Sequence, residues 1–446
     1  MIRQMTAPLQ FLQEFRQRLM GIFTRRADAL FELMEALLLT LDPRSPVELS
    51  ASPAFRRRFA SVYDALCHGQ IDARLARELL TTAEPPDALQ VEGYAVYAVD
   101  STITARPDAK TLPDRGKVYS ASKGAPVPGH QYSWLGRVIA QGQSWFAPRD
   151  VERIATTTTP AALAAEQVKR LAATIALSRA AVIVADSHYA QRAFLEVFVS
   201  LPNVVVLVRL ACNRVLYGPV PPVLGKRPKG RPPLHGEKFK LTAPPLPERQ
   251  ATFPLGKATV RVSAWTRLHF KALAALAGMV LRVEFLNAAG QPMYQRPLWL
   301  FWNGPTSVTL EALCQMYLLR FGIEHFFRFA KQRLGLLIAQ TPQLAACEIW
   351  VWVVALAYTQ LLLARTVVTA QPRPWDPKVR RDPQQPLTPG QVRQAWLAFS
   401  HGLGTPAHAP RPGGKAPGRA VGFKPRPREK CPVVSKQRQP AVLAVA

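Results

Sequence analysis

Cysteine, acidic side chains and long apolar runs are all scarce in this chain of 446 residues. Its five cysteines form no C-x-x-C pair and have no histidine at zinc spacing, which argues against a zinc site and indicates reduced, structural thiols of a cytoplasmic protein. The N-terminus is interrupted by charges and lacks the apolar core of a signal peptide. The longest apolar run, residues 349–364, is shorter than the roughly 20 residues that span a bilayer. We therefore expect a buried helix there and no membrane partner.

The shortage of acidic residues leaves 57 lysines and arginines against 29 aspartates and glutamates, a net charge of +28. Such an excess favours a polyanionic partner, because each neutralised phosphate releases condensed counterions. A merely soluble basic surface is the alternative, but such chains are usually shorter and poorer in large apolar residues, whereas 48% of this chain is hydrophobic. The composition therefore predicts a folded protein of two or three domains that binds nucleic acid.

The first half of the chain changes from a helical to a mixed pattern. Apolar residues at helical spacing with basic residues between them predict a helical N-terminal DNA-binding domain over residues 1–88, although a solvated basic face explains the pattern equally well. Over residues 89–209 we expect three strands, a helix, a strand, a short helix and a strand. This order resembles the ribonuclease H-like core, an α/β fold in which a mixed sheet is flanked by helices.

The second half interrupts that core and then completes it. Residues 210–297 predict a β-rich insertion with a basic loop, and residues 298–368 return to the core with a strand and one long helix. Residues 369–446 are rich in proline, glycine and basic residues, and from Gln371 onward they hold 14 basic and 3 acidic residues, a net of +11 (14 − 3). We expect this basic tail to be largely disordered, with one helix in "TPGQVRQAWLAFS".

Two aspartates follow strand-like segments of the predicted core. "YAVYAVDSTI" predicts a strand that ends at Asp100, and "AAVIVADSHYA" predicts a buried strand that ends at Asp186. An aspartate after a strand is often only a turn or cap residue. Two carboxylates brought together at one sheet edge would repel each other unless a divalent cation held them.

The segment "YLLRFGIEHFFRFAK", residues 317–331, places charged residues along one side of an apolar helix. At 100° per residue, four of its side chains fall within an arc of about 60°, and Arg328 extends the same seam. Those four are Tyr317, Arg320, Glu324 and Lys331. An ordinary salt bridge on a solvated face would not explain why the other faces are so apolar.

The spacing of these four residues resembles the Y-(2)-R-(3)-E-(6)-K signature of the insertion-sequence-four (IS-four) group of DDE transposases. The signature follows Asp100, Asp186 and an insertion, and the resemblance extends over roughly residues 90 to 365. It implies that Asp100, Asp186 and Glu324 are catalytic and bind two Mg²⁺ or Mn²⁺ ions. It further implies cut-and-paste transposition in a bacterial, nucleoid-associated protein that acts as a homodimer on the terminal inverted repeats of its element and on target DNA.

The resemblance and the composition together suggest further DNA contacts. Arg320 and Lys331 would bind phosphates beside the cleaved bond, with Tyr317 bonded to the backbone and Arg328 beside them. We further expect Trp299 and Trp302 to stack on a base that is flipped out of the duplex, although core packing is the commoner role of such residues. The basic loop "GKRPKGRPPLHG" is expected to follow phosphates through Lys226, Arg227, Lys229 and Arg231.

Two alternative functions stay open at this point. A non-catalytic DNA-binding relic or regulator of transposon ends would tend to have lost one of the three carboxylates, and all three are present. A stand-alone ribonuclease H-like nuclease would not need the basic N-terminal helices, the insertion or the tail. Inverted repeats in the DNA that flanks the reading frame would separate a transposase from such a nuclease.

Overall fold

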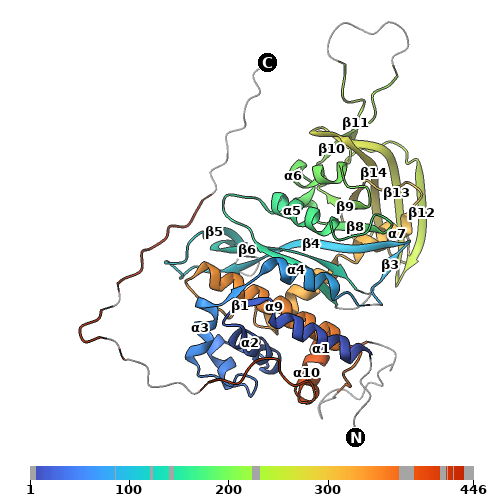
Figure 1. Cartoon of the computed structure of the whole chain (residues 1–446). Helices are drawn as coiled ribbons and strands as arrows, with labels where there is room; N and C mark the ends of the chain where they lie inside the picture. The colour runs from blue at the N-terminus through green and yellow to red at the C-terminus, as the bar shows by residue number, and fades with distance from the viewer. Residues whose placement is uncertain are drawn as a thin grey trace.

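A single mixed sheet runs through the molecule in this computed structural model, and helices cover both of its faces (Figure 1). The structure describes residues 7–85, 87–120, 124–139, 145–222, 232–370, 386–411, 418, 420–424 and 426–435. Within these residues the sheet has 13 strands, in the order β11-β10-β13-β14-β15-β9-β8-β4-β6-β5, with β12, β3 and β7 paired beside that path. The architecture confirms the expected α/β class.

Five strands in the middle of the sheet form the core that the sequence predicts. Their bounds are β4 (Tyr94–Ala105), β6 (Ala125–Val138), β7 (Phe146–Arg153), β8 (Ala180–Ala185) and β9 (Val204–Leu210). β7, β6 and β4 pair antiparallel, whereas β8 and β9 continue the sheet in parallel with β4. β8 is almost wholly buried, because helices pack on both sides of it, and this accounts for its continuous apolar sequence. A mixed sheet of this kind is consistent with a ribonuclease H-like DDE fold.

The strands of the predicted insertion extend this sheet instead of forming a detached unit. They are β10 (Val215–Tyr217), β11 (Lys238–Lys240), β12 (Arg249–Leu255), β13 (Ala258–Phe270) and β14 (Leu273–Leu286), followed by β15 (Leu298–Trp302). β15 pairs antiparallel with both β14 and β9, so the insertion is hydrogen-bonded to the edge of the core. Two short strands, β3 (Gln90–Val91) and β5 (Gly116–Ser120), add to the opposite part of the sheet.

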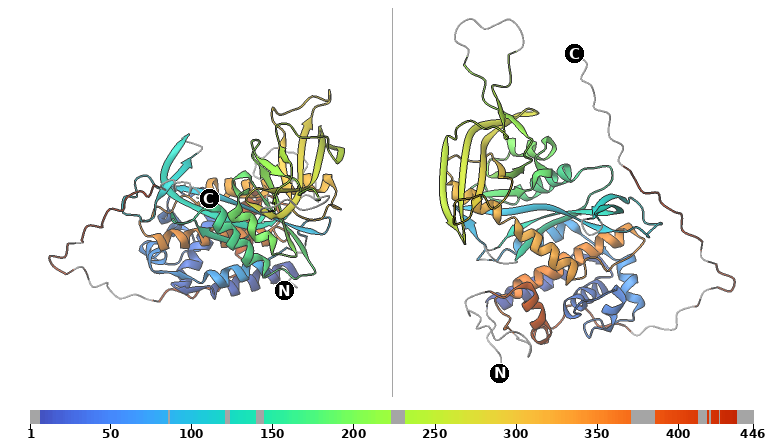
Figure 2. Two further views of the ribbon diagram at one scale, coloured as in Figure 1. Left: turned by 90° about the horizontal axis from the view of Figure 1, so that it is seen from above. Right: turned by 180° about the vertical axis from the view of Figure 1, so that it is seen from behind.

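The N-terminal helices form a layer against one face of the sheet, together with the apolar helix α9 (Leu344–Ala364) (Figure 2). This layer contains α1 (Ala7–Met20), α2 (Ala27–Leu39), α3 (Ala60–His68) and α4 (Ala73–Thr82), with η1 (Pro46–Ala51), β1 (Phe23–Arg25) and β2 (Gln70–Ile71) between them. Buried Arg16 of α1 donates to Glu35 of α2 at 2.7 Å and to Gln360 of α9 at 2.6 Å. A buried ion pair between α1 and α2 and a hydrogen bond from the same arginine to α9 tie the three helices in one arrangement, so residues 7–85 share a core with the sheet and α9.

Helix α9 is long and apolar enough to cross a membrane by length and composition. In the fold, however, 94% of its most apolar window is buried by the surrounding helices and sheet. The expectation of a buried helix at residues 349–364 is therefore confirmed. The core helix of a folded protein meets the same criteria as a membrane span, because both are apolar on every side.

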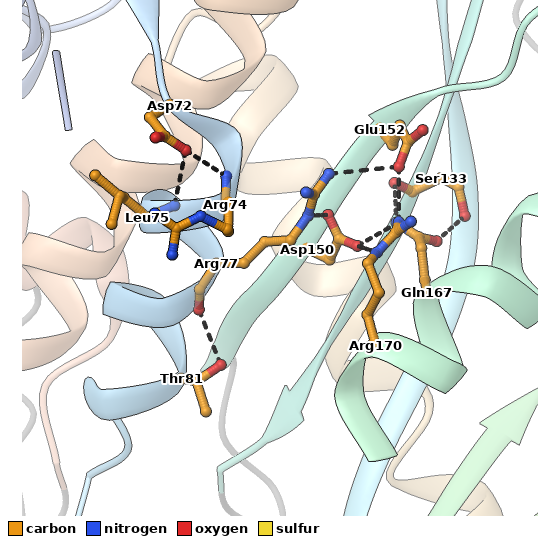
Figure 3. A network of polar contacts seen from close by, with 10 residues as sticks. All are labelled: Asp72, Arg74, Leu75, Arg77, Thr81, Ser133, Asp150, Glu152, Gln167 and Arg170. Carbon is orange, nitrogen blue, oxygen red and sulfur yellow. Dashed lines mark hydrogen bonds and ion pairs between the residues drawn. The ribbon is translucent and has the colours of Figure 1, made fainter. Parts of the chain in front are cut away.

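A polar network connects the N-terminal layer with the opposite face of the sheet (Figure 3). Arg77 of α4 donates to Asp150 of β7 at 2.7 Å, and Arg170 of α5 (Pro160–Ala172) donates to the same carboxylate at 2.8 Å. Glu152, two residues along β7, also accepts from Arg170, at 2.7 Å. Two arginines thus neutralise two carboxylates where the edge of the sheet lies between two helices, and part of the large positive charge has this internal role.

Residues 386–411 of the tail are packed against the N-terminal layer, whereas the amides of Cys431 and Val434 donate to the carbonyls of Lys110 and Arg115, each at 2.8 Å. Helix α10 (Pro389–Ser400) begins with a capping box between Thr388 and Gln391, and its Val392 and Trp396 are fully buried. Beyond it, Arg56 donates to the carbonyl of Ala407 at 2.8 Å. The predicted helix in the tail is therefore present as α10, and residues 386–411 pack on the N-terminal layer, while the expectation of a largely disordered tail stays a prediction. The proline-rich composition gave no sign of this packing, which depends on the burial of one side of a single helix, α10.

Candidate active site

The sheet brings the two predicted aspartates together. β4 and β8 pair in parallel up to Ala98 and Val184, so Asp100 and Asp186 each lie two residues beyond the last pair, on neighbouring strands. Asp186 comes directly after β8, as predicted. β4 does not end at Asp100, however, because its residues 99–105 remain paired with β6. Asp100 is therefore held by a strand on one side and open on the other, where β8 has ended.

The third carboxylate is carried by a helix that differs from the predicted one. Instead of one long helix there are two, α7 (Leu310–Leu318) and α8 (Phe321–Gln332), separated by a turn at Leu319 and Arg320. The amides of Arg320 and Ile323 donate to carbonyls three residues earlier, each at 3.1 Å, which tightens the chain at this point. The break places Arg320 at the start of α8, four residues before Glu324.

Aromatic packing fixes α8 against the strand that carries Asp100. Trp134 of β6 lies directly opposite Asp100 in the β4–β6 pairing. Its indole packs edge-on against Phe326 of α8, with ring centroids 4.9 Å apart, and Phe326 also meets Tyr358 of α9 at 4.7 Å. Because Phe326 is two residues from Glu324, these contacts set where the glutamate lies relative to Asp100.

Arg320 connects two of the three carboxylates. Its guanidinium donates from Nη1 to Asp100 Oδ2 at 3.2 Å and from Nη2 to Glu324 Oε1 at 2.6 Å. The arginine is buried, whereas the Glu324 side chain is 44% exposed. The sequence predicts a buried helix with one polar seam, and in α8 two residues of that seam, Glu324 and Arg328, form an exposed face together with His325. That face leaves Glu324 free to turn toward a ligand.

The electrostatics of Asp100 show that the other two carboxylates act on it. Burial, followed by the charge of Asp186, raises the pKa of Asp100 to about 6, and Glu324 adds to the rise while Arg320 and the Ser101 amide oppose it. Burial lowers the pKa of Lys331, which the charge of Asp100 partly restores. Asp100 thus carries an uncompensated cost when it is ionised, which an additional cation at this point would relieve.

The residues fit a divalent metal by chemistry and by charge. Three carboxylates provide hard oxygen donors, which Mg²⁺ and Mn²⁺ prefer, and the raised pKa of Asp100 reflects its burial first and then the charges of Asp186 and Glu324. As the side chains now lie, no three acidic, histidine or cysteine residues in the described ranges are grouped closely enough to hold a metal. Arg320 occupies the position between Asp100 and Glu324, so metal binding requires the glutamate or the arginine to turn.

Asp186 is positioned by its own turn. Its Oδ1 accepts from the amide of His188 at 2.9 Å, which caps the short 3₁₀ turn η2 (Ser187–Tyr189), and its Oδ2 lies 2.8 Å from His188 Nδ1. The short helix α6 (Arg192–Leu195) and the 3₁₀ turn η3 (Glu196–Val199) follow it. One carboxylate oxygen is thus used in capping, and the histidine orients the other.

The other predicted DNA-binding residues have different surroundings. Tyr317 is buried beneath Arg320, whose guanidinium lies 5.9 Å from its ring centroid, and Arg328 is exposed on α8. Trp299 and Trp302 are 3% and 0% exposed, so both are core residues in this structure and stacking on a base would require the core to open. The predicted loop residues Lys226, Arg227, Lys229 and Arg231 lie outside the described residues.

A cavity beside Glu324 contains basic residues that the sequence analysis missed. It has a volume of about 720 Å³ and lies between α7–α8 and the strands β14 and β15. Its lining includes Arg209, Arg282, Arg296 and Tyr294 in addition to Tyr317, Arg320 and Glu324. The available signal was an arginine inside each of two largely apolar strand sequences, "VVVLVRL" and "GMVLRVEFL", the second of which also contains Glu284.

Comparisons with known proteins identify the family of the chain. The family model described as "DDE superfamily endonuclease" matches residues 18–271, which include Asp100 and Asp186 but not Glu324. A cryo-EM structure of a piggyBac transposase synaptic complex with hairpin DNA is similar at a TM-score of 0.43 and 11% identity, over 90% of this chain and 81% of that one. No curated protein matches. Because the family model covers more than half of the 446 residues, the chain belongs to the DDE superfamily of endonucleases.

Proposed function

We propose that this endonuclease is a transposase of the IS-four type, which cuts DNA at the ends of its own element and joins those ends to target DNA. The observation that carries the proposal is the convergence of Asp100, Asp186 and Glu324, from two strands and a helix, at one end of the central parallel strands. The net charge of +28 supports a DNA partner, and membership of the DDE endonuclease family supports phosphodiester chemistry.

The three carboxylates would hold two Mg²⁺ ions. Bound there, the metal supplies an activated water or 3′-hydroxyl as nucleophile and stabilises the leaving oxygen. In the hydrolytic step the water oxygen bonds to phosphorus, the bond from phosphorus to the 3′ oxygen breaks, and a proton passes to that oxygen. The products are a 3′-hydroxyl and a 5′-phosphate. Joining to target DNA repeats the displacement with the 3′-hydroxyl as nucleophile.

The residues of the chain position these groups. β4 and the turn after β8 hold Asp100 and Asp186 in fixed places, and the Trp134–Phe326 contact keeps α8 beside them. Arg320 neutralises Asp100 and Glu324 when no metal is bound, and its two aromatic neighbours hold it beside the site. Once released, its guanidinium is placed to bind a phosphate of the substrate, with Lys331 beside Asp100 as a second cation.

The proposal extends to the assembly and the setting of the protein. Joining two element ends requires two active sites, so we propose a homodimer on paired terminal inverted repeats. We propose a location in the bacterial cytoplasm with the nucleoid, because the substrate is chromosomal DNA.

The test is cleavage of DNA that carries the sequences flanking the reading frame. Purified protein with Mg²⁺ should cut at the element ends, and protein with a chelator should bind the same DNA without cutting it. Cutting at unrelated sequences as readily as at the ends would instead favour a general nuclease. Binding of the ends without cutting under any divalent cation would favour the non-catalytic regulator.

A further inference from the structure

The cavity beside Glu324 is positively charged beyond what the protein itself neutralises. Four arginines and two glutamates line it, which gives a net charge of +2 (4 − 2). Arg282 pairs with Glu284 at 2.8 Å and Arg320 pairs with Glu324 at 2.6 Å. Arg209 and Arg296 have no ion pair in the described part of the chain, and both are exposed. The excess therefore belongs to these two side chains.

The paired arginines also have unused hydrogen-bonding capacity. The Nε groups of Arg282 and Arg320 are buried, and neither has an acceptor among the described residues. Four other arginines in the described residues, Arg57, Arg106, Arg149 and Arg365, share this feature, so it is compatible with an anionic ligand at the cavity, and the case for that ligand depends on the net charge and the two unpaired guanidinium groups. Planar guanidinium groups match the oxygens of phosphate.

The position of Arg209 connects the cavity with the reacting groups. Arg209 lies opposite Leu300 in the β9–β15 pairing, and Leu300 belongs to the core beneath α7. Its positive charge lowers the pKa of Tyr317, against a larger rise from burial. Arg209 is therefore on the α7 side of the sheet, near Tyr317, and Tyr317 lies beside Arg320. An anion bound by Arg209 would lie next to the phosphodiester that the carboxylates cut.

The size and rim of the cavity indicate one or two nucleotides instead of a duplex. Its volume of about 720 Å³ is in the range of sites for small ligands, about 300–1,000 Å³. Tyr294 is 63% exposed and Phe321 is 44% exposed at its lining, which leaves aromatic surface for contact with a sugar or base. The lining thus combines cations with exposed rings.

We propose that this cavity binds the 5′-phosphate end of a DNA strand, with Arg209 and Arg296 as its main phosphate ligands. Arg282 does not take part while it is paired with Glu284. A terminal phosphate carries between one and two negative charges near neutral pH, which matches the net +2 of the lining better than the single charge of a backbone phosphate. The inference rests on the proposed function, because breaking the bond to the 3′ oxygen is what leaves a 5′-phosphate. The site would retain the cut end beside the carboxylates.

The test compares two short single strands of DNA that differ only in a 5′-phosphate or a 5′-hydroxyl, with binding measured by fluorescence anisotropy in a chelator. The wild-type protein should bind the phosphorylated strand at least about tenfold more tightly, as expected from one or two added charge-assisted hydrogen bonds. Arg209→Gln and Arg296→Gln should each reduce that ratio toward one, and Arg209→Lys should keep part of it. Glu284→Gln should tighten binding of the phosphorylated strand by releasing Arg282.

Lys271→Gln is the matched control, because Lys271 is an exposed cation of the insertion that does not line the cavity. This variant should weaken the binding of both strands equally. Equal binding of the two strands by the wild-type protein, or a ratio unchanged in both arginine variants, would overturn the inference. Inorganic phosphate that binds as tightly as the phosphorylated strand would overturn it in favour of a free-anion site.

Binding in a chelator also separates this inference from the proposed function. A preference for the 5′-phosphate without Mg²⁺-dependent cutting would support the phosphate site and contradict the transposase function. Cutting at element ends without that preference would support the transposase function and contradict the phosphate site.

Discussion

Arg320 donates to Asp100 across 220 positions of sequence, at 3.2 Å, and the same guanidinium reaches Glu324 at 2.6 Å. This contact joins the central strand of the sheet to the helix that carries the third carboxylate. A guanidinium there reduces the repulsion that the carboxylates would otherwise feel in a metal-free protein. The arginine therefore has two roles in the account, as a counter-charge before metal binds and as a phosphate ligand afterwards.

Replacing Arg320 should separate these roles. Arg320→Ala should lower the metal-free thermal unfolding temperature, because buried Asp100 then has no counter-charge at hydrogen-bonding distance, and millimolar Mg²⁺ should recover most of the loss. Cleavage should fall and should not recover with Mg²⁺, since the phosphate ligand is gone. An unfolding temperature that Mg²⁺ does not raise in this variant would show that the arginine and the metal do not substitute for each other.

In the metal-free protein, the ionised Asp100 side chain should reduce the free energy of unfolding. Because its pKa is raised from 3.8 to about 6, Asp100→Asn should raise the free energy of unfolding at pH 7 in a chelator by about 1–3 kcal/mol, and should abolish cleavage. Chemical denaturation measures the gain. Asp108→Asn is the control, since Asp108 is exposed on the loop after β4 and should change stability by less than about 0.5 kcal/mol. A destabilised Asp100→Asn protein would contradict the account.

The Trp134–Phe326 contact should matter to stability as well as to the position of Glu324. Phe326 is fully buried between Trp134, Phe146 and Tyr358, so Phe326→Ala should cost about 3–5 kcal/mol. Phe321→Ala, on the same helix but 44% exposed, should cost far less. Denaturant titration of both variants checks this, and similar losses in the two would mean that α8 is not anchored through Phe326.

His130 should make the protein sensitive to acid. Burial lowers its pKa below the ordinary value of 6.5, while its Nε2 lies 3.0 Å from the carbonyl of Pro113 as a donor to it. As pH falls through 6.5, His130 binds a proton in the unfolded chain but stays neutral in the folded protein. The stability contributed by neutral His130 is therefore present above pH 6.5 and declines below it. His130→Gln, which keeps a donor, should show a smaller loss of stability between pH 7 and pH 5. An identical pH profile for both proteins would count against it.

The strands that hold the two aspartates were predictable from their apolar, strand-forming sequences, and Asp186 directly follows β8, whereas the continuation of β4 beyond Asp100 depends on its pairing with β6. The break between α7 and α8 was not predictable, since Leu318, Leu319 and Arg320 all favour helix and no proline marks the turn. It follows from tertiary contacts, which require α8 to meet both Trp134 and Asp100. The sharing of a core between α1, α2 and α9 was hidden for a similar reason: periodicity shows that a helix has an apolar face but not which partner covers it.

The cavity residues escaped notice because they come from three separate places in the chain. Arg209 ends a core strand, Arg282 lies in the insertion, and Arg296 precedes β15. Only the pairing of β15 with both β14 and β9 brings them together. Trp299 and Trp302 have the core role that is commoner for such residues, because Trp299 packs against Trp265 of β13 and Trp302 against Tyr94 of β4.

The most direct test of the account is cleavage of labelled element-end DNA by the wild-type protein and by Asp186→Asn and Glu324→Gln, with Glu311→Gln as the control because Glu311 is an exposed residue of α7 outside the site. The account predicts Mg²⁺-dependent cutting by the wild-type and control proteins. The cleavage rate of both site variants should fall more than about 100-fold, while their affinity for the element ends stays unchanged. Loss of a residue that only hydrogen-bonds to a metal ligand costs about 10–100-fold, so a larger loss indicates direct metal ligands. Cutting by either site variant at the wild-type rate would contradict the three-carboxylate site.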